Sequence, residues 1–225
     1  MNPTLYITPT PIGNYEDITL RALRILKHVD FIICEEIKPA NRLLSYYNIK
    51  KELIPLNEHN EKEVTNNVIE KLLLGKSAAI ISDAGTPLFS DPGHYLIELC
   101  IKNKIEIISL PGANSLVPAL VSSGLYIEKF YYFGWLSPKK DSRINQLKRL
   151  KNIREMIVIL ETPYRLQKLL NDIALTFGER IYIVLAYKIS MPEEKIFRGT
   201  VSSIFKIVEK ENLKGEFVLI LDNRK

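Results

Sequence analysis

The chain has 225 residues, of which 46% are hydrophobic and 25% are charged, and its formal net charge is +5. These values are typical of a globular protein with a sizeable core, and they exclude a disordered or fibrous chain. The mild basic excess is compatible with a nucleic-acid partner without identifying one. No stretch approaches the 18 or so apolar residues of a membrane helix, and the amino terminus lacks a basic region followed by a long apolar run. We therefore expect a cytoplasmic protein without a membrane partner.

The first 120 residues alternate short apolar runs with stretches of helical periodicity. Buried strands are predicted at residues 5–8, 29–34, 77–82 and 105–110. Helices are predicted after Asp17, at residues 41–47, after Glu61 with Gly75 just past the end, at residues 94–102, and after Asn114 to near Gly124. Asp17, Asp91 and Asn114 are expected to cap three of these helices, with Pro92 in the first turn of the helix that Asp91 caps. This βαβ alternation predicts a parallel sheet.

The second half of the chain is richer in aromatic residues. Strands are predicted at residues 130–136, 155–160, 181–187, 195–198 and 217–221, and helices at residues 164–177 and 201–209. Tyr126, Tyr131 and Tyr132 either contribute to a subunit interface or pack in the core, and packing in the core is favoured. We therefore expect an α/β protein made of two α/β domains, residues 1–118 and residues 119–225.

A basic segment follows the first predicted strand of the second half. Residues 139–154 contain seven Lys or Arg residues and one Asp. Two interpretations stay open: the segment is the solvated face of a helix, or it contacts the phosphates of a nucleic acid. The candidates for RNA contact are Lys139, Lys140, Arg143, Lys148 and Arg149.

Three strands of the first half end in loops rich in Gly and Pro, at residues 9–14, 83–87 and 111–115. In an open parallel sheet, ligands bind at the carboxyl ends of the strands. The alternative is that these residues only make turns, because neither GxGxxG nor GxxxxGK[ST] is present. Glu35 and Glu36 follow another strand, where they either take part in acid–base chemistry or lie in a solvated turn.

Cysteine and histidine usage indicates neither a disulfide nor a metal site. Cys34 and Cys100 lie in apolar stretches, so two buried free thiols are expected rather than a disulfide. The three histidines are scattered without the spacing of metal ligands, and His59 is expected to make loop hydrogen bonds. No metal is expected.

Seven motifs resemble one known family, and they occur in the family's order along almost the whole chain. They are LYITPTPIGNYEDITLRAL (5–23), SDAGTPLFSDPG (82–93), LPG (110–112), FGWLSPKK (133–140), ETPYR (161–165), RGT (198–200) and KGEFVL (214–219). The chain resembles the tetrapyrrole methylase superfamily of S-adenosylmethionine (SAM) methyltransferases. Within it, the chain is most similar to the bacterial enzymes that methylate the ribose 2′-hydroxyl of a cytidine in 16S rRNA.

The resemblance implies a tetrapyrrole methylase-like fold, with SAM bound in a cleft between the two α/β domains. It also implies 16S rRNA of the small ribosomal subunit as partner and substrate, and a homodimer. The positions that match the family's cofactor site are Pro11, Ile12, Gly13, Asn14, Gly85, Thr86, Pro87, Leu88, Phe89, Asn114, Ser115, Leu160, Glu161, Ala186, Gly215 and Glu216. Small residues allow backbone amides to reach a ligand, and a helix beginning at Asn114 would direct its N-terminus towards a carboxylate.

A ribose hydroxyl is a poor nucleophile, so methyl transfer to it needs a base or an oriented acceptor. The carboxylates considered for this role are Glu35, Glu36 and Asp83, and the sequence does not select one. Three segments depart from the family pattern: EEIK (35–38) for EDTR, PGANS (111–115) for a PGPSA-like segment, and YKISM (187–191) for one like RELTK. The sequence also ends soon after KGEFVL, so an RNA contact from the extra carboxy-terminal segment of some members is not expected.

Two other functions stay open. The first is methylation of a corrinoid or another tetrapyrrole, but the TPIGN and SDAGTP motifs differ from the glycine-rich variants of those enzymes. The second is a non-catalytic member of the fold that binds RNA or a ribosomal partner. The intact cofactor loops argue against this second alternative, because a binding module has no need of Gly85 and Pro87.

Overall fold

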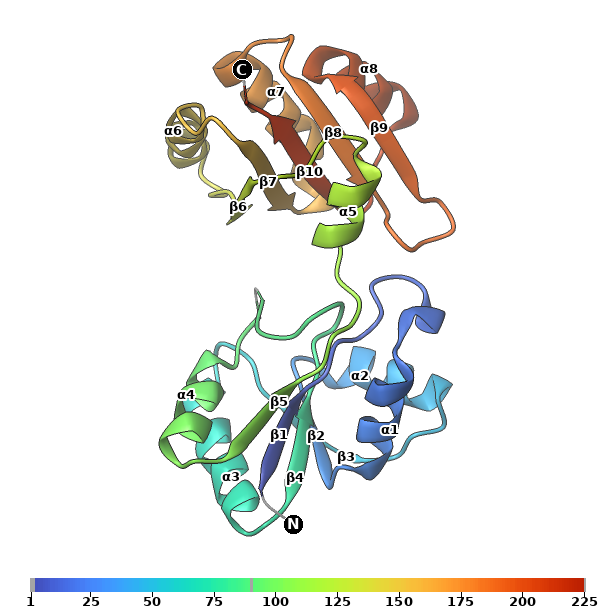
Figure 1. Ribbon diagram of the computed structural model, residues 1–225, viewed down its shortest axis with the longest axis vertical. Helices are drawn as coiled ribbons and strands as arrows, with labels where there is room; N and C mark the ends of the chain where they lie inside the picture. Colours follow the sequence, from blue (N-terminus) through green and yellow to red (C-terminus); the bar gives the residue numbers. More distant parts are fainter. Residues whose placement is uncertain (1–2, 90, 225) are drawn as a thin grey trace. The chain divides into compact units, whose positions relative to one another are not determined.

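The computed structural model describes residues 3–89 and 91–224 (Figure 1). The chain forms two compact units, Met1–Asn114 and Ser115–Lys225. A division at residue 118 would pass through helix α5 (Leu116–Ser122), whose Ala119 and Leu120 belong to the core of the second unit. The two units are therefore described separately, with α5 in the second.

The first unit contains a five-stranded sheet in the order β3-β2-β4-β1-β5. Its strands are β1 (Thr4–Ile7), β2 (Phe31–Cys34), β3 (Glu52–Pro55), β4 (Ser77–Ile80) and β5 (Glu106–Ser109). Every pairing is parallel, which confirms the prediction from the βαβ alternation. The edge strand β3 was not predicted, because its apolar run is only Leu53 and Ile54.

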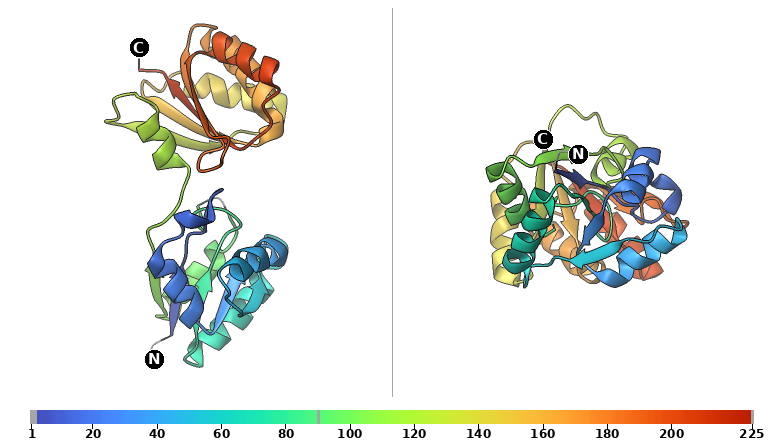
Figure 2. Two further views of the ribbon diagram at one scale, coloured as in Figure 1. Left: turned by 90° about the vertical axis from the view of Figure 1, so that its right-hand side faces the viewer. Right: turned by 90° about the horizontal axis from the view of Figure 1, so that it is seen from below.

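Helices cover both faces of this sheet (Figures 1 and 2). They are α1 (Leu20–His28), α2 (Ile37–Tyr46), α3 (Glu61–Leu73) and α4 (His94–Lys102). Alternate residues of a strand point to opposite faces. In β2, Phe31 and Ile33 accordingly pack with α3 and α4, whereas Ile32 and Cys34 pack with α1 and α2. Cys34 and Cys100 are buried free thiols as predicted, and burial raises the pKa of each to about 11.

Three predicted helix caps are wrong. Helix α1 is capped by Thr19, whose Oγ1 accepts from Ala22 N at 3.0 Å, and Asp17 lies instead in the short helix η1 (Tyr15–Asp17). The N-cap of α5 is Ser115 rather than Asn114. A capping side chain is only one way to satisfy the first amides of a helix, so the residue type alone did not identify these ends.

The third wrong cap is Asp91, because a side chain from another helix caps α4 in its place. The N-cap of α4 is Gly93, with φ +119°, and Pro92 precedes the helix. Glu61 Oε1, at the start of α3, accepts from Gly93 N at 2.9 Å and from Tyr95 N at 3.1 Å. A carboxylate at a helix N-terminus is favoured by the helix dipole. The carboxylate of Asp91 is therefore not used to cap this helix.

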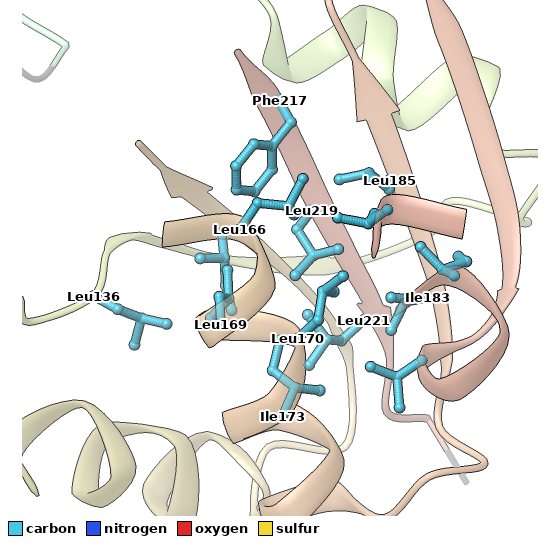
Figure 3. Close-up of a cluster of buried hydrophobic side chains, with 14 of the residues drawn as sticks. Leu136, Leu166, Leu169, Leu170, Ile173, Ile183, Leu185, Phe217, Leu219 and Leu221 are labelled. Carbon is cyan, nitrogen blue, oxygen red and sulfur yellow. The ribbon is translucent and has the colours of Figure 1, made fainter. Parts of the chain in front are cut away.

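The second unit contains a mixed sheet in the order β6-β7-β10-β8-β9. Its strands are β6 (Phe130–Trp135), β7 (Met156–Glu161), β8 (Tyr182–Tyr187), β9 (Lys195–Thr200) and β10 (Phe217–Asp222). Only the β6–β7 pairing is parallel. Helices α6 (Lys140–Leu150), α7 (Leu166–Phe177) and α8 (Val201–Glu211) enclose an aliphatic core against one face of this sheet, as Figure 3 shows in part, and α5 packs on the other face.

Replacement of Glu61 by Ala should lower the free energy of unfolding of the first unit by about 1–2 kcal/mol, because two amides of α4 lose their acceptor. Urea unfolding followed by circular dichroism measures this change. Glu63→Ala is the matched control, because Glu63 lies in the same first turn of α3. A loss in Asp91→Asn, with none in Glu61→Ala, would contradict this assignment of the cap.

Candidate functional site

The loops that follow β1, β4 and β5 meet at the carboxyl edge of the first sheet. Thr10 N donates to Gly85 O at 2.8 Å, and Gly85 N donates to Thr10 O at 3.0 Å. Thr10 Oγ1 also donates to Ser82 O at 3.0 Å, and Thr86 Oγ1 donates to Ala113 O at 3.3 Å. The loops are therefore joined mainly through backbone groups.

Two glycines allow this close approach. Gly85 has φ +85°, and a Cβ on it would lie 3.3 Å from Ile12 Cγ2. A Cβ on Gly112 would lie 2.5 Å from Cβ of Pro9, whose ring is rigid. Leu88 also has a left-handed backbone, with φ +70°, which is strained for a residue with a side chain. Such strain is typical of ligand-binding loops, and larger residues at either glycine would disrupt the meeting of the three loops.

The predicted cofactor residues of the first unit lie in or beside these loops. Ile12, Gly85 and Thr86 are brought together directly. The side chain of Asn14 is used locally, because its Oδ1 accepts from Glu16 N at 3.0 Å, and Phe89 is 52% exposed. Ser90 of the SDPG motif lies outside the described residues.

Four carboxylates gather beside these loops. Glu35 and Glu36 follow β2, and Asp83 and Asp91 follow β4. Glu35, Ser82 and Asp91 border a small pocket with apolar walls; its other lining residues are Ile33, Cys34, Leu56, Ile80, Ile81, Pro87 and Pro92. Sequence reasoning missed Asp91 as a member of this cluster, because Asp before Pro and a helix is a typical cap.

Burial raises the pKa values of three of these carboxylates, Glu35, Asp83 and Asp91, and the charge of a neighbouring carboxylate raises each of them further. Loss of hydration, then the charge of Asp83, raises the pKa of Glu35, with smaller contributions from Asp91, Glu36 and Glu58. Loss of hydration raises the pKa of Asp83 too, followed by the charge of Glu36, whose backbone N–H acts in the opposite direction by donating to Asp83. The pKa of Asp91 rises by burial and through Asp83. Asp83 is thus the shared neighbour of the cluster.

The predicted cofactor residues of the second unit gather at one edge of its sheet. Leu160 of β7 and Ala186 of β8 both pair with Val218 of β10. A Cβ on Gly215 would lie 2.7 Å from the hydroxyl of Tyr187, so Gly215 permits a close backbone approach here. Burial raises the pKa of neighbouring Glu216. Their contact with a cofactor stays a prediction.

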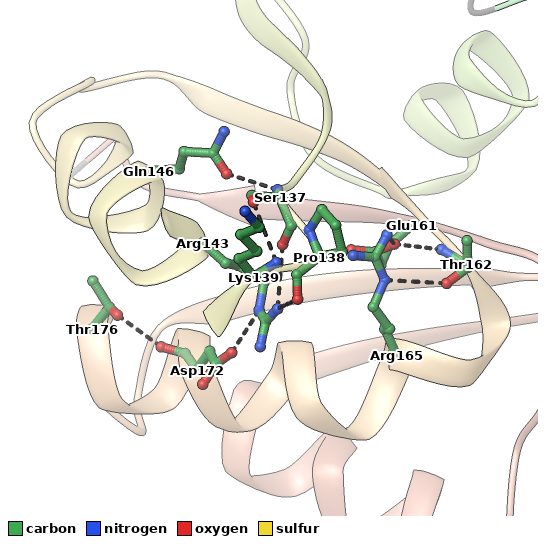
Figure 4. Close-up of polar contacts among 10 residues, drawn as sticks. All are labelled: Ser137, Pro138, Lys139, Arg143, Gln146, Glu161, Thr162, Arg165, Asp172 and Thr176. Carbon is green, nitrogen blue, oxygen red and sulfur yellow. Dashed lines mark hydrogen bonds and ion pairs between the residues drawn. The ribbon is translucent and has the colours of Figure 1, made fainter. Parts of the chain in front are cut away.

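Glu161 carries an unsatisfied buried atom at this same edge. Its Oε1 accepts from Thr162 N at 2.7 Å and pairs with Arg165 Nη2 at 2.5 Å (Figure 4). Glu161 Oε2 and Arg165 Nη1 are buried without a hydrogen-bond partner among the described residues. A buried polar atom without a partner costs free energy, so its retention is typical of a site that receives a polar ligand.

The predicted basic surface is partly wrong. Lys139, Lys140, Lys148 and Arg149 are exposed on or beside α6. Arg143 is buried, and its Nε donates to Asp172 Oδ2 of α7 at 2.7 Å (Figure 4). Arg143 occupies the inward face of α6 that Leu147 and Leu150 also occupy, where a guanidinium needs a carboxylate partner. It therefore cannot contact RNA directly.

Two further kinds of site were sought among residues 3–89 and 91–224. No group of three or more His, Cys, Asp and Glu side chains there is arranged to hold a metal ion. In the same residues, every helix is too short or too polar to cross a bilayer.

The pKa shift of Glu35 predicts a pH-dependent stability. The pKa of Glu35 is higher in the folded than in the unfolded protein. The contribution of Glu35 to the free energy of unfolding is therefore fully present below its unfolded-state pKa, and it is lost as pH rises through its folded-state pKa. Glu35→Gln should therefore unfold at a higher urea concentration than the wild type at pH 7, and the gain should vanish below about pH 4, where Glu35 is protonated in both states. Glu98→Gln, at an exposed position on α4, is the control, and an equal gain there would contradict the prediction.

Comparison with known proteins identifies the family of this chain. The family model described as Tetrapyrrole (Corrin/Porphyrin) Methylases matches residues 4–204. "Ribosomal RNA small subunit methyltransferase I" of Buchnera aphidicola subsp. Schizaphis graminum is 41% identical over 224 residues, which are 98% of this chain and 79% of that protein. The protein of the same name from Bacillus subtilis is 35% identical over 218 residues, covering 97% of this chain and 74% of the relative.

A solved structure supports the fold. The uroporphyrin-III C-methyltransferase of Thermus thermophilus, complexed with S-adenyl homocysteine, superposes with a TM-score of 0.65 at 16% identity and covers 97% of this chain and 96% of its own. At that identity the likeness concerns the fold alone. The family model and the two relatives carry the assignment: the chain belongs to the tetrapyrrole methylase family.

Proposed function

We propose that the protein transfers a methyl group from SAM to the ribose 2′-hydroxyl of a cytidine in 16S rRNA of the small ribosomal subunit. The observation that carries this proposal is the identity of 35–41% to proteins named ribosomal RNA small subunit methyltransferase I, over nearly the whole chain. Structural neighbours named uroporphyrin-III C-methyltransferase share only 15–20% of their residues with it. The choice of cytidine and of the 2′-hydroxyl rests on the sequence motifs.

The loops of the first unit fit a SAM site. A solved neighbour holds S-adenyl homocysteine, the product that SAM leaves after methyl transfer. Gly85 and Gly112 allow the three loops to lie against one another, because a Cβ at these positions would press on Ile12 or Pro9. When bound, SAM supplies a methyl group activated by its sulfonium. The residues that would hold it here are Ile12, Gly85, Thr86 and their neighbours in the same loops.

The remaining task of the protein is to orient the ribose hydroxyl and accept its proton. We assign the role of proton acceptor to the carboxylate of Asp83. Asp83 lies two residues before Gly85, so the backbone that bonds to Thr10 also fixes its position. The N–H of Glu36 orients the carboxylate of Asp83, while loss of hydration and then the charge of Glu36 raise its pKa and hence its basicity.

The function is tested by methyl transfer from labelled SAM to small ribosomal subunits purified from cells that lack the protein. We expect labelled 2′-O-methylcytidine after nuclease digestion. Gly85→Arg should abolish the label. Gly85→Ala should lower the label at least tenfold. An alanine is strained in the left-handed backbone at position 85, and its Cβ would press on Ile12. Gly75→Ala is the matched control, since Gly75 has φ +86° and nothing lies within 4 Å of its added Cβ.

Each other outcome selects an alternative. Labelling of a tetrapyrrole without labelling of RNA would leave the cofactor assignment in place and overturn the substrate. Absence of SAM binding, measured by calorimetry, would favour a non-catalytic RNA- or ribosome-binding protein. Equal losses in Gly75→Ala and Gly85→Ala would mean that the loop site is not involved.

The role of Asp83 is tested separately. Asp83→Asn should lower kcat by about 10²-fold or more while the Kd for SAM stays within twofold, because the amide keeps the size but cannot accept the proton. The wild-type rate should rise with pH through the raised pKa of Asp83 and then level off, since the base acts in its deprotonated form. A larger loss in Glu35→Gln or Glu36→Gln would transfer the role to that residue.

A homodimer and a cytoplasmic location stay predictions. Tyr126 and Tyr131, two of the aromatic residues considered for an interface, are 79% and 43% exposed, whereas Tyr132 packs against the core on the α5 side of the sheet. Light scattering of the purified protein measures the oligomeric state.

A further inference from the structure

The second unit presents exposed aromatic and basic side chains together at one edge of its sheet. Trp135 ends β6 and is 45% exposed, and Tyr164 lies in the short helix η2 (Pro163–Arg165) and is 89% exposed. Parallel pairing sets Trp135 beside Leu160, so β6 and β7 end at the same edge and η2 follows directly. Lys139, Lys140 and Lys168 are exposed in the adjoining first turns of α6 and α7. We call these five residues the aromatic–basic surface.

We propose that the aromatic–basic surface binds unpaired nucleotides of the RNA substrate, with a base stacked on Tyr164 and the lysines beside phosphates. This inference rests on the proposed function, because it assigns the RNA contact of the same enzyme. Proteins that bind single-stranded nucleic acid combine aromatic rings, on which bases stack, with cations that follow the backbone.

The charges at this edge favour a polyanion. Two of its carboxylates are already paired inside the protein, Glu161 with Arg165 and Asp172 with Arg143. No ion pair involves Lys139, Lys140 or Lys168 within the described part of the chain. Asp141 is the acidic residue exposed nearest to them in the sequence. The lysines therefore keep their charge free for phosphates, and an acidic partner rather than an apolar one fits the surface.

The loop that carries Lys139 is held by hydrogen bonds from α6. Arg143 Nη1 donates to Ser137 O at 3.2 Å and to Pro138 O at 3.0 Å, and Ser137 N donates to Gln146 Oε1 at 2.8 Å (Figure 4). Asp172 fixes the guanidinium from the other side. Arg143, expected from the sequence to contact RNA, thus acts as a positioning residue for Lys139 and Lys140.

The turn that carries Tyr164 is held in the same way. Thr162 N donates to Glu161 Oε1, Arg165 Nε donates to Thr162 Oγ1 at 3.3 Å, and Arg165 N donates to Thr162 O at 3.0 Å. The two residues next to Tyr164 are partly buried, while its own ring is in solvent. A large apolar ring kept in water on a rigid turn loses little conformational entropy when a base stacks on it.

The test is fluorescence anisotropy with a labelled, unstructured RNA of about 12 nucleotides, a length within the site sizes of single-strand binding proteins. Tyr164→Ala should raise the Kd about tenfold, the loss of one stacked base, and Tyr164→Phe should stay within about twofold because the ring remains. The double replacement of Lys139 and Lys140 by Ala should reduce the slope of log Kd against log salt concentration by about 1.4, because two phosphate contacts of a single strand are lost.

Matched controls come from the same unit. Tyr126→Ala removes another exposed tyrosine, located before the amino end of β6, and Lys206→Ala with Lys210→Ala removes two lysines of α8. Both should leave the Kd and the salt slope unchanged. Thermal unfolding of every variant shows whether the unit stays folded. Replacement of Tyr164 should leave the melting temperature unaltered, because its ring is exposed.

Three results would overturn the proposal: an unchanged Kd in Tyr164→Ala, equal losses in Tyr164→Phe and Tyr164→Ala, or binding of heparin as tight as binding of RNA. Binding of a ribosomal protein that depends on Tyr164, with no RNA binding, would replace it. If rRNA is methylated while Tyr164→Ala keeps the wild-type Kd and KM, the surface fails and the function stands. If Tyr164 governs RNA binding but no RNA is methylated, the function fails and the surface stands.

Discussion

The reciprocal backbone hydrogen bonds between Thr10 and Gly85 are the constraint on which the site of the first unit depends. They join the loop after β1 to the loop after β4, although those residues are 75 positions apart in the chain. A side chain at position 85 would be strained by the left-handed backbone, and its Cβ would lie 3.3 Å from Ile12. The parallel sheet supplies the common edge, and these two bonds convert separate turns into one loop cluster beside the acidic residues.

The second unit achieves rigidity by a different means, with desolvated ion pairs instead of backbone bridges. Arg143–Asp172 and Glu161–Arg165 each satisfy backbone groups in addition to one another. A buried pair of this kind adds little net stability, since both charges lose their hydration. What it provides is a defined conformation for the loop or turn that it contacts. The exposed residues on those segments, Lys139 and Tyr164, are thereby held ready for a partner.

Much of the architecture could be predicted from the sequence, because strand and helix periodicities in this chain are strong. Four of the five strands of the first unit, their parallel pairing and the free thiols followed from apolar runs and their spacing. Helix ends did not, since Glu61 caps α4 from another helix and no local pattern shows that. Arg143 was misplaced for a related reason: a basic segment shows charge, but only the partner Asp172, 29 residues later, decides that this arginine is buried.

The two units carry opposite local charge, and the proposed chemistry accounts for this difference. A base that accepts a proton from a hydroxyl works best when its pKa is raised, as loss of hydration and then the charge of Glu36 raise it at Asp83. The same carboxylates repel RNA phosphates, so they cannot also supply affinity. The attraction then has to come from cations elsewhere, and Lys139, Lys140 and Lys168 are exposed without acidic partners in the described second unit. A phosphate group close to Asp83 would raise the pKa of its carboxylate further, which favours proton uptake at the step that needs it.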